Sequence, residues 1–240
     1  MLLDLEWSAI IDGIGSQECV ICLGPEIFMD YNNTNSGVPV HLTEKLSEYL
    51  KQYEDILKIR IQENGWFHLQ QGGSDGPTYQ AIKSFYNNVL TSHTELILNK
   101  IARIKSHLFL SITPDYHLLN TFENLGLKYN FDSYFRNQPN RNQDIPSVDI
   151  PLIYNLLGEL KYRNSLVLTY DDFFDYLESV IKGNSMSKLI KNNLLDAQYY
   201  LFIGIPFDQW FVHLFMRILK QHKQKKTKFA AGKATSFKNR

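Results

Sequence analysis

Short, almost uninterrupted hydrophobic runs recur along the chain, and each stops at a small or turn-forming residue. The clearest is Cys-Val-Ile-Cys-Leu at residues 19–23, which ends at Gly24 and Pro25. Further runs of this kind lie at residues 107–110, 152–154, 165–168 and 199–203. Because these runs do not alternate apolar with polar residues, they predict strands covered on both faces, as in a parallel sheet.

Helical periodicity fills the intervals between these runs. Apolar residues from Leu46 to Ile61 line one helical face, which predicts a single amphipathic helix over residues 46–61. The other helices are predicted over residues 81–90, 94–104, 170–177 and 207–221. Strands alternating with helices predict an α/β fold, with a Rossmann-like, doubly wound, mainly parallel sheet and helices on both faces.

The chain shows no internal repeat and no linker, so we expect one domain over residues 1–240. Two irregular stretches, residues 65–77 and 137–151, are rich in turn-forming or polar residues and are expected to be loops. A strand-like start at Lys228 gives way to polar residues, and we therefore expect a further segment downstream in the native protein.

Composition and charge narrow the function classes. With 44% hydrophobic and 21% charged residues, disordered and fibrous proteins are excluded. No apolar run approaches the ~18–20 residues that cross a bilayer, and the first residues lack a basic segment. We therefore expect a cytoplasmic protein with no membrane partner. The net charge is zero, but residues 217–240 hold nine basic residues and no acid, which leaves 16 basic against 25 acidic residues elsewhere.

Several residues have spacings that suggest chemistry, and each has a structural alternative. Cys19 and Cys22 form a C-x-x-C pair, but residues three apart on a strand point to opposite faces, so we expect two core thiols. Asp171, Asp172 and Asp175 fit the first turns of a helix, where the helix dipole favours acids, and we predict no metal site. The basic tail over residues 220–240 suggests nucleic acid as a partner, or a solvated helix end.

In a doubly wound sheet, ligands bind beyond the carboxyl ends of the strands. The loop after the first strand offers Gly24 for such a site, but Pro25 has no N–H group to donate to a phosphate. The chain lacks both the G-x-G-x-x-G and the G-x-x-x-x-G-K-[ST] spacings. On this evidence the glycine is more typical of a plain turn.

Five segments, taken in order, nevertheless resemble the SIR2-like (sirtuin-related) domains of bacterial antiviral systems. Leu-Val-Leu-Thr-Tyr-Asp-Asp-Phe-Phe-Asp-Tyr-Leu at residues 166–177 is similar to the family's V-L-T-x-x-D-Y-x-x-Y-L segment. The other similar segments are residues 19–24, 110–117, 151–158 and 201–210. The resemblance covers residues 17–231 in the family's order.

This resemblance implies an NAD-binding fold, and in active members hydrolysis of NAD by an asparagine and a histidine. The implied cofactor-binding residues are Gly24, Glu26, Thr113, Gly158, Gly204 and Asp208. The asparagine position holds Asp115 and the histidine position holds Leu157, which cannot accept a proton. Glu26 replaces a glycine and would repel a pyrophosphate. His117, close to Asp115, is either a substitute base or a residue that caps a helix or lies on the surface.

Three hypotheses follow. The first is a catalytically degenerate member of a bacterial defence system, which binds NAD weakly or not at all and acts through self-association or a partner protein. The second is an active NAD glycohydrolase that uses Asp115 and His117 to deplete NAD on infection. The third is a nucleic-acid-binding module that acts through the basic tail.

Overall fold

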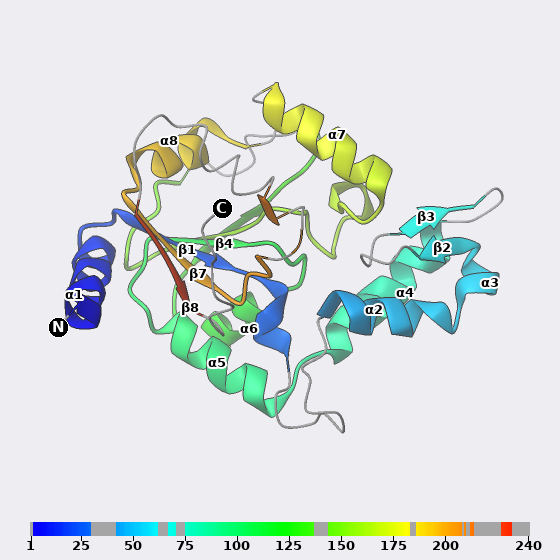
Figure 1. The fold of residues 1–240 in the computed structure, drawn as a ribbon, viewed down its shortest axis with the longest axis horizontal. Coiled ribbons are helices and arrows are strands. Elements are labelled where there is room, and N and C mark those ends of the chain that lie inside the picture. Colours follow the sequence, from blue (N-terminus) through cyan, green and yellow to red (C-terminus); the bar gives the residue numbers. More distant parts are fainter. Residues whose placement is uncertain are drawn as a thin grey trace.

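A six-stranded parallel sheet forms the centre of the molecule (Figure 1). The computed structural model describes residues 2–29, 42–61, 67–70, 75–136, 144–182, 186–207, 209, 212–213 and 227–231. The strand order is β5-β6-β4-β1-β7-β8. These strands are β1 (Cys19–Leu23), β4 (Leu108–Ser111), β5 (Asn130–Ser133), β6 (Leu152–Asn155), β7 (Tyr199–Ile203) and β8 (Thr227–Ala231).

Helices cover both faces of this sheet, because its central strands are apolar on both faces. Along β1, Cys19 and Ile21 point into one core cluster, whereas Val20 and Cys22 point into the other. The first cluster is closed by α5 (Ser92–Ala102) and α6 (His117–Asn124), and the second by α7 (Tyr170–Ile181) and α8 (Lys188–Asp196). The predicted Rossmann-like α/β fold is confirmed.

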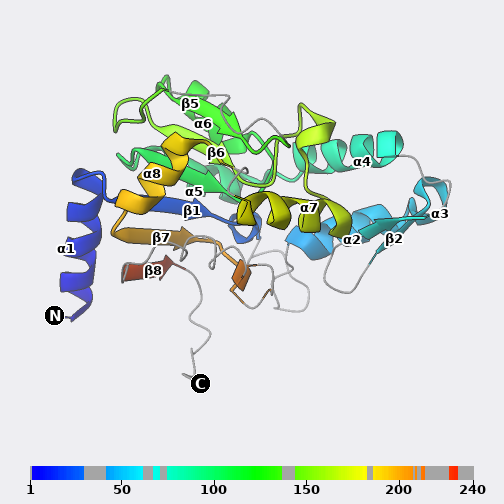
Figure 2. The same cartoon turned by 90° about the horizontal axis from the view of Figure 1, so that it is seen from above.

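A smaller unit lies beyond the carboxyl end of β1, on the right of Figures 1 and 2. It consists of α2 (Leu42–Lys51), α3 (Glu54–Leu57), β2 (Ile59–Ile61), β3 (Phe67–Leu69) and α4 (Asp75–Asn88). The prediction of one helix over residues 46–61 is wrong. Lys58 adopts a left-handed conformation with φ of 50°, which ends the helical path, and Ile59–Ile61 then pairs antiparallel with Phe67–Leu69.

The predicted strand over residues 165–168 is also wrong. Arg163–Ser165 forms a 3₁₀ turn, η2, and the residues after it run extended without joining the sheet. Leu166 is buried in one core cluster and Val167 in the other, so this segment is as apolar as a sheet strand. The sheet instead gains β5, an edge strand with the sequence Asn-Phe-Asp-Ser. Because this strand contains polar residues, it forms no hydrophobic run in the sequence that would predict a strand.

Most of the remaining sequence predictions agree with the structure within a few residues. The hydrophobic runs at residues 19–23, 107–110, 152–154 and 199–203 are β1, β4, β6 and β7, and the helices predicted at 81–90, 94–104 and 170–177 are α4, α5 and α7. Most of the helix predicted over residues 207–221 and most of the tail over 220–240 lie outside the described residues. Within the described part of the chain, every helix is too short or too polar to span a membrane.

Candidate functional site

Two glycines interlock at the carboxyl ends of β1 and β7. A Cβ atom added to Gly24 would lie 2.2 Å from the carbonyl oxygen of Gly204. Gly204 has a φ of 65°, in the left-handed region that favours glycine, and a Cβ there would lie 2.6 Å from the backbone nitrogen of Ile27. Both positions require glycine because the two loops pack backbone against backbone.

The same contact uses the backbone donors of the loop after β1. The Gly24 N–H donates to the Ile203 carbonyl at 2.9 Å, and the Glu26 N–H donates to the Gly204 carbonyl at 2.9 Å. Pro25 has no N–H, and it begins a short 3₁₀ helix, η1 (Pro25–Phe28). The Ile27 N–H points back to the Gly24 carbonyl at 3.4 Å. This loop therefore offers none of these donors to a phosphate.

The loop after β4 places Asp115 in a buried position at the start of α6. Its Oδ1 atom accepts a hydrogen bond from the His117 N–H at 2.9 Å, and its carbonyl accepts one from the Asn155 side chain at 3.0 Å. Asp115 is only 8% exposed, and its Oδ2 atom is buried without a hydrogen-bond partner in the described part of the protein. Nearby, the Thr113 hydroxyl lies 2.9 Å from that of Ser111. One carboxylate oxygen is thus buried and unpartnered at this strand end.

The His117 side chain lies in the core and not at the surface. Its Nε2 atom is 2.7 Å from the carbonyl oxygen of Tyr86 on α4, and its ring packs against Phe28 with 5.6 Å between centroids. Asp115, and not His117, caps the first turn of α6. Burial and the charge of Asp115 raise the pKa of the Tyr86 hydroxyl. The His117 imidazole is thus held by the Tyr86 carbonyl on one side and by the Phe28 ring on another.

The loop after β6 is held by backbone contacts. Leu157 is half-buried, packs against the second core cluster, and its carbonyl accepts a hydrogen bond from the Val167 N–H at 3.1 Å. Gly158 has a φ of 88°, and a Cβ there would lie 2.0 Å from the Ser165 carbonyl oxygen. Glycine is required here for packing, and Leu157 supplies no group that transfers a proton.

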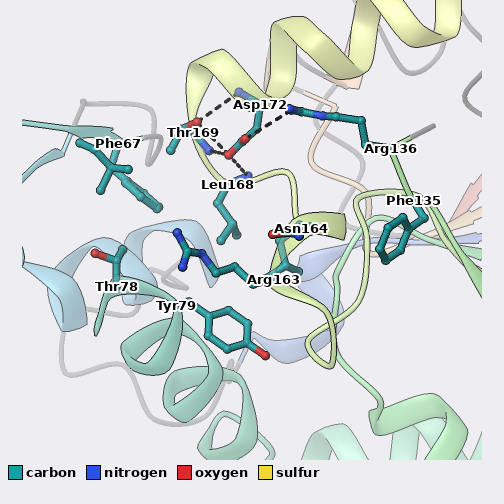
Figure 3. Close-up of a pocket in the computed structure, with 12 residues that line it drawn as sticks. Phe67, Thr78, Tyr79, Phe135, Arg136, Arg163, Asn164, Leu168, Thr169 and Asp172 are labelled. Atoms are coloured by element: carbon teal, nitrogen blue, oxygen red, sulfur yellow. Dashed lines mark hydrogen bonds and ion pairs between the residues drawn. The ribbon is translucent and has the colours of Figure 1, made fainter. Parts of the chain in front are cut away.

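A hollow of about 520 Å³ opens beside these strand ends, between α4, β3, η2 and the start of α7 (Figure 3). The Arg163 side chain reaches across it between Leu168 and Tyr79. At its rim, Arg136 forms ion pairs with Asp175 at 2.9 Å and Asp172 at 3.7 Å. None of the described residues predicted for the site lines this hollow.

A model of the SIR2-like domain family matches residues 114–238, just over half of the chain. The chain belongs to the SIR2-like family. Within the matched region lie Asp115, Leu157, Gly158 and Gly204, whereas Gly24 and Glu26 precede it. A search of curated proteins found no match. SIR2-like domains have NAD-related functions, and Asp208, the remaining residue predicted to bind NAD, lies outside the described residues.

In this SIR2-like chain, a capping box accounts for the first-turn acid Asp172. The Thr169 hydroxyl accepts from the Asp172 N–H at 3.1 Å, and the Asp172 carboxylate accepts from the Thr169 N–H at 3.0 Å. Over the described ranges, no three His, Cys, Asp or Glu residues are grouped so that they could hold a metal ion.

The two thiols of the chain lie in opposite core clusters, as predicted. Cys19 and Cys22 are both fully buried and unpaired with each other. Burial raises the pKa of Cys19 to about 11, so its thiol is protonated at neutral pH. Both residues fill the core.

A buried carboxylate, Glu159, links the loop after β6 to neighbouring segments, and no sequence pattern indicated it. Glu159 accepts hydrogen bonds from the Tyr116 hydroxyl at 2.8 Å and the Ser133 hydroxyl at 2.9 Å. Burial and this carboxylate raise the pKa of Tyr116. Tyr116 in turn accepts from the Lys161 N–H at 2.9 Å. This network fixes the loop after β6 against β5 and the start of α6.

Proposed function

We propose that this SIR2-like chain does not hydrolyse NAD and acts as an interaction or regulatory module of a bacterial defence system in the cytoplasm. The observation that carries the proposal is the contact between Gly24 and Gly204, which uses the backbone donors that a pyrophosphate would need. The resemblance of the five ordered segments to defence-type members supports the biological setting. NAD binding is accordingly weak or absent.

The electrostatics of the first loop support this proposal. A phosphate site relies on free N–H groups and attraction of negative charge. Here the Gly24 and Glu26 N–H groups already donate within the fold, and Glu26 adds a carboxylate to the loop. Binding a pyrophosphate at this loop would require breaking two backbone hydrogen bonds, at about 1 kcal/mol each.

The chemistry at the neighbouring strand ends also supports it. Cleavage of the nicotinamide–ribose bond by water needs a group that accepts a proton from that water. Leu157 has no such group, and the Nε2 atom of His117 is engaged with the Tyr86 carbonyl.

Nicotinamide release tests this proposal. Purified protein is incubated with NAD, and nicotinamide is quantified by chromatography beside a protein-free control. We expect the wild type to match the control. We expect the same of Leu157→His, because an imidazole at this position does not restore the donors at Gly24 and Glu26. Turnover that scales with the amount of wild-type protein, or that appears in Leu157→His, would overturn the proposal.

A second candidate function, NAD hydrolysis with a rearranged site, is favoured by one observation. The Oδ2 atom of Asp115 is buried at the carboxyl end of β4 without a described partner, and an anion there would stabilise a developing positive charge on ribose. Under this hypothesis wild-type protein releases nicotinamide and Asp115→Ala loses that activity. The melting temperature of the variant is measured beside it, because alanine also removes the oxygen that accepts the His117 N–H.

A further inference from the structure

A second hollow, of about 400 Å³, lies at the edge of the sheet opposite the candidate site. Its walls are the segments that immediately precede β4, β5 and β6. Phe122, Leu125 and Leu127 give it an apolar floor, and Leu127 is 39% exposed. Phe122 is buried and Leu125 is half-buried, so among these three residues Leu127 supplies the apolar surface that is open to solvent.

Three cations surround this floor. Arg103, Lys105 and Lys128 are exposed and line the hollow together with one acid, Asp149. No ion pair joins these three cations to any residue that the structure describes. The hollow therefore fits a partner that combines large apolar side chains with negative charge.

The helix α1 (Leu2–Gly15) has this combination. Trp7 and Ile11 are 54% and 64% exposed, and residues four apart lie on the same face of a helix. The sequence of α1 holds three acids, Asp4, Glu6 and Asp12, and no base. The negative charge disfavours an anionic lipid surface as the partner of this face.

The body of the molecule holds α1 firmly from its other side. Ile10 is buried in the first core cluster. Gly13 packs so closely on β7 that an added Cβ would lie 2.5 Å from the Tyr199 ring. The helix is thus presented with Trp7 and Ile11 outward, and little ordering would be needed before a partner binds.

The helix and the hollow lie at the same edge of the sheet. Since α1 leads directly into β1, and the walls of the hollow lead into β4, β5 and β6, all of them lie where the parallel strands begin. Figures 1 and 2 both show α1 at this edge, away from α2, α3 and α4. Because the helix and the hollow lie on one edge, a two-fold axis can place the helix of each copy against the hollow of the other.

We propose that two copies of this chain associate through these edges. Trp7 and Ile11 of each copy lie in the hollow of the other, and Arg103, Lys105 and Lys128 offset the net negative charge of the α1 sequence. This contact extends the interaction role proposed above. It does not depend on the absence of NAD turnover, so the nicotinamide assay and the association assay can fail separately.

Light scattering after size exclusion tests the contact on the full chain. We expect a dimer of ~56 kDa, twice the 28.0 kDa of one chain. Trp7→Glu and Arg103→Glu should each raise the dimer dissociation constant at least about tenfold, as loss of an interface anchor does. Ile56→Glu, at a residue 77% exposed on α3, is the matched control and should remain dimeric.

The melting temperatures of the variants distinguish loss of the contact from loss of the fold. At a protein concentration low enough for the wild type to be monomeric, the variants should melt at the same temperature as the wild type. A wild type that is monomeric at high micromolar concentration would overturn the proposal. So would a dimer that survives both Trp7→Glu and Arg103→Glu. A monomer that binds anionic vesicles through Trp7 would also overturn it, and would assign this face to lipid.

Discussion

Replacing Gly24 with alanine tests whether this glycine serves the fold or a ligand. The added methyl carbon would lie 2.2 Å from the Gly204 carbonyl oxygen and 2.8 Å from the Cα atom of Ile205. Gly24 itself has a φ of −123°, which alanine adopts without strain, so the whole effect comes from the collision. The neighbouring atoms are backbone, and the loops after β1 and β7 must therefore move apart.

The magnitude follows from the contacts at this point. Overpacking of a filled site costs about 1–3 kcal/mol. Separation of the loops also weakens the hydrogen bonds from Gly24 to Ile203 and from Glu26 to Gly204, at about 1 kcal/mol each. We expect Gly24→Ala to lower the free energy of unfolding by roughly 3–5 kcal/mol. For a domain of this size the melting temperature should fall by roughly 6–20 °C.

Urea unfolding followed by circular dichroism measures this loss, and two alanine variants serve as controls. A Cβ at Gly15 meets no atom within 4 Å, and Gly15→Ala should be neutral or slightly stabilising. Gly126 has a φ of 66° in open space, so Gly126→Ala should lose only about 1–2 kcal/mol from the left-handed conformation. If Gly24→Ala unfolds like the wild type but loses affinity for NAD, our account of the first loop is wrong.

Three further outcomes are expected. Cys19 and Cys22 should not react with a thiol reagent at neutral pH until the protein is unfolded, and fast labelling of the native state would contradict their burial. Burial lowers the pKa of His107, so below pH ~6.5 the unfolded chain takes up a proton before the folded protein does. The free energy of unfolding should therefore fall as the pH drops from ~6.5 towards the lower folded-state pKa, by at most about 1.4 kcal/mol per pH unit. His107→Gln should reduce this slope in urea titrations. Thr169→Ala should lower the free energy of unfolding by about 1 kcal/mol through loss of the capping box, whereas Thr169→Ser should retain it.

The buried strands could be predicted from the sequence because burial on both faces leaves a continuous apolar signal. The run at residues 19–23 is β1, with every residue buried. The same signal misassigned residues 165–168, since Leu166 and Val167 fill two cores from outside the sheet. The edge strand β5 was missed because its alternation of polar residues does not differ from that of a loop.

The positions of the candidate site could be predicted, but their contacts could not. Gly24, Asp115 and Gly204 follow strands in the sequence, and parallel strands bring their carboxyl ends to one edge. The contact between Gly24 and Gly204 joins residues far apart in the chain, and no local pattern records it. The burial of His117 likewise depends on Tyr86 and Phe28, which belong to other elements.

The melting temperature of the protein with and without millimolar NAD tests the central claim most directly. A ligand at 100 times its Kd adds about 2.7 kcal/mol to the stability of the folded state, which corresponds to roughly 5–11 °C in a domain of this size. We expect no rise in melting temperature with NAD or with ADP-ribose, because the Gly24 and Glu26 N–H groups of the loop after β1 already donate hydrogen bonds within the fold. A saturable rise of that size would contradict the account.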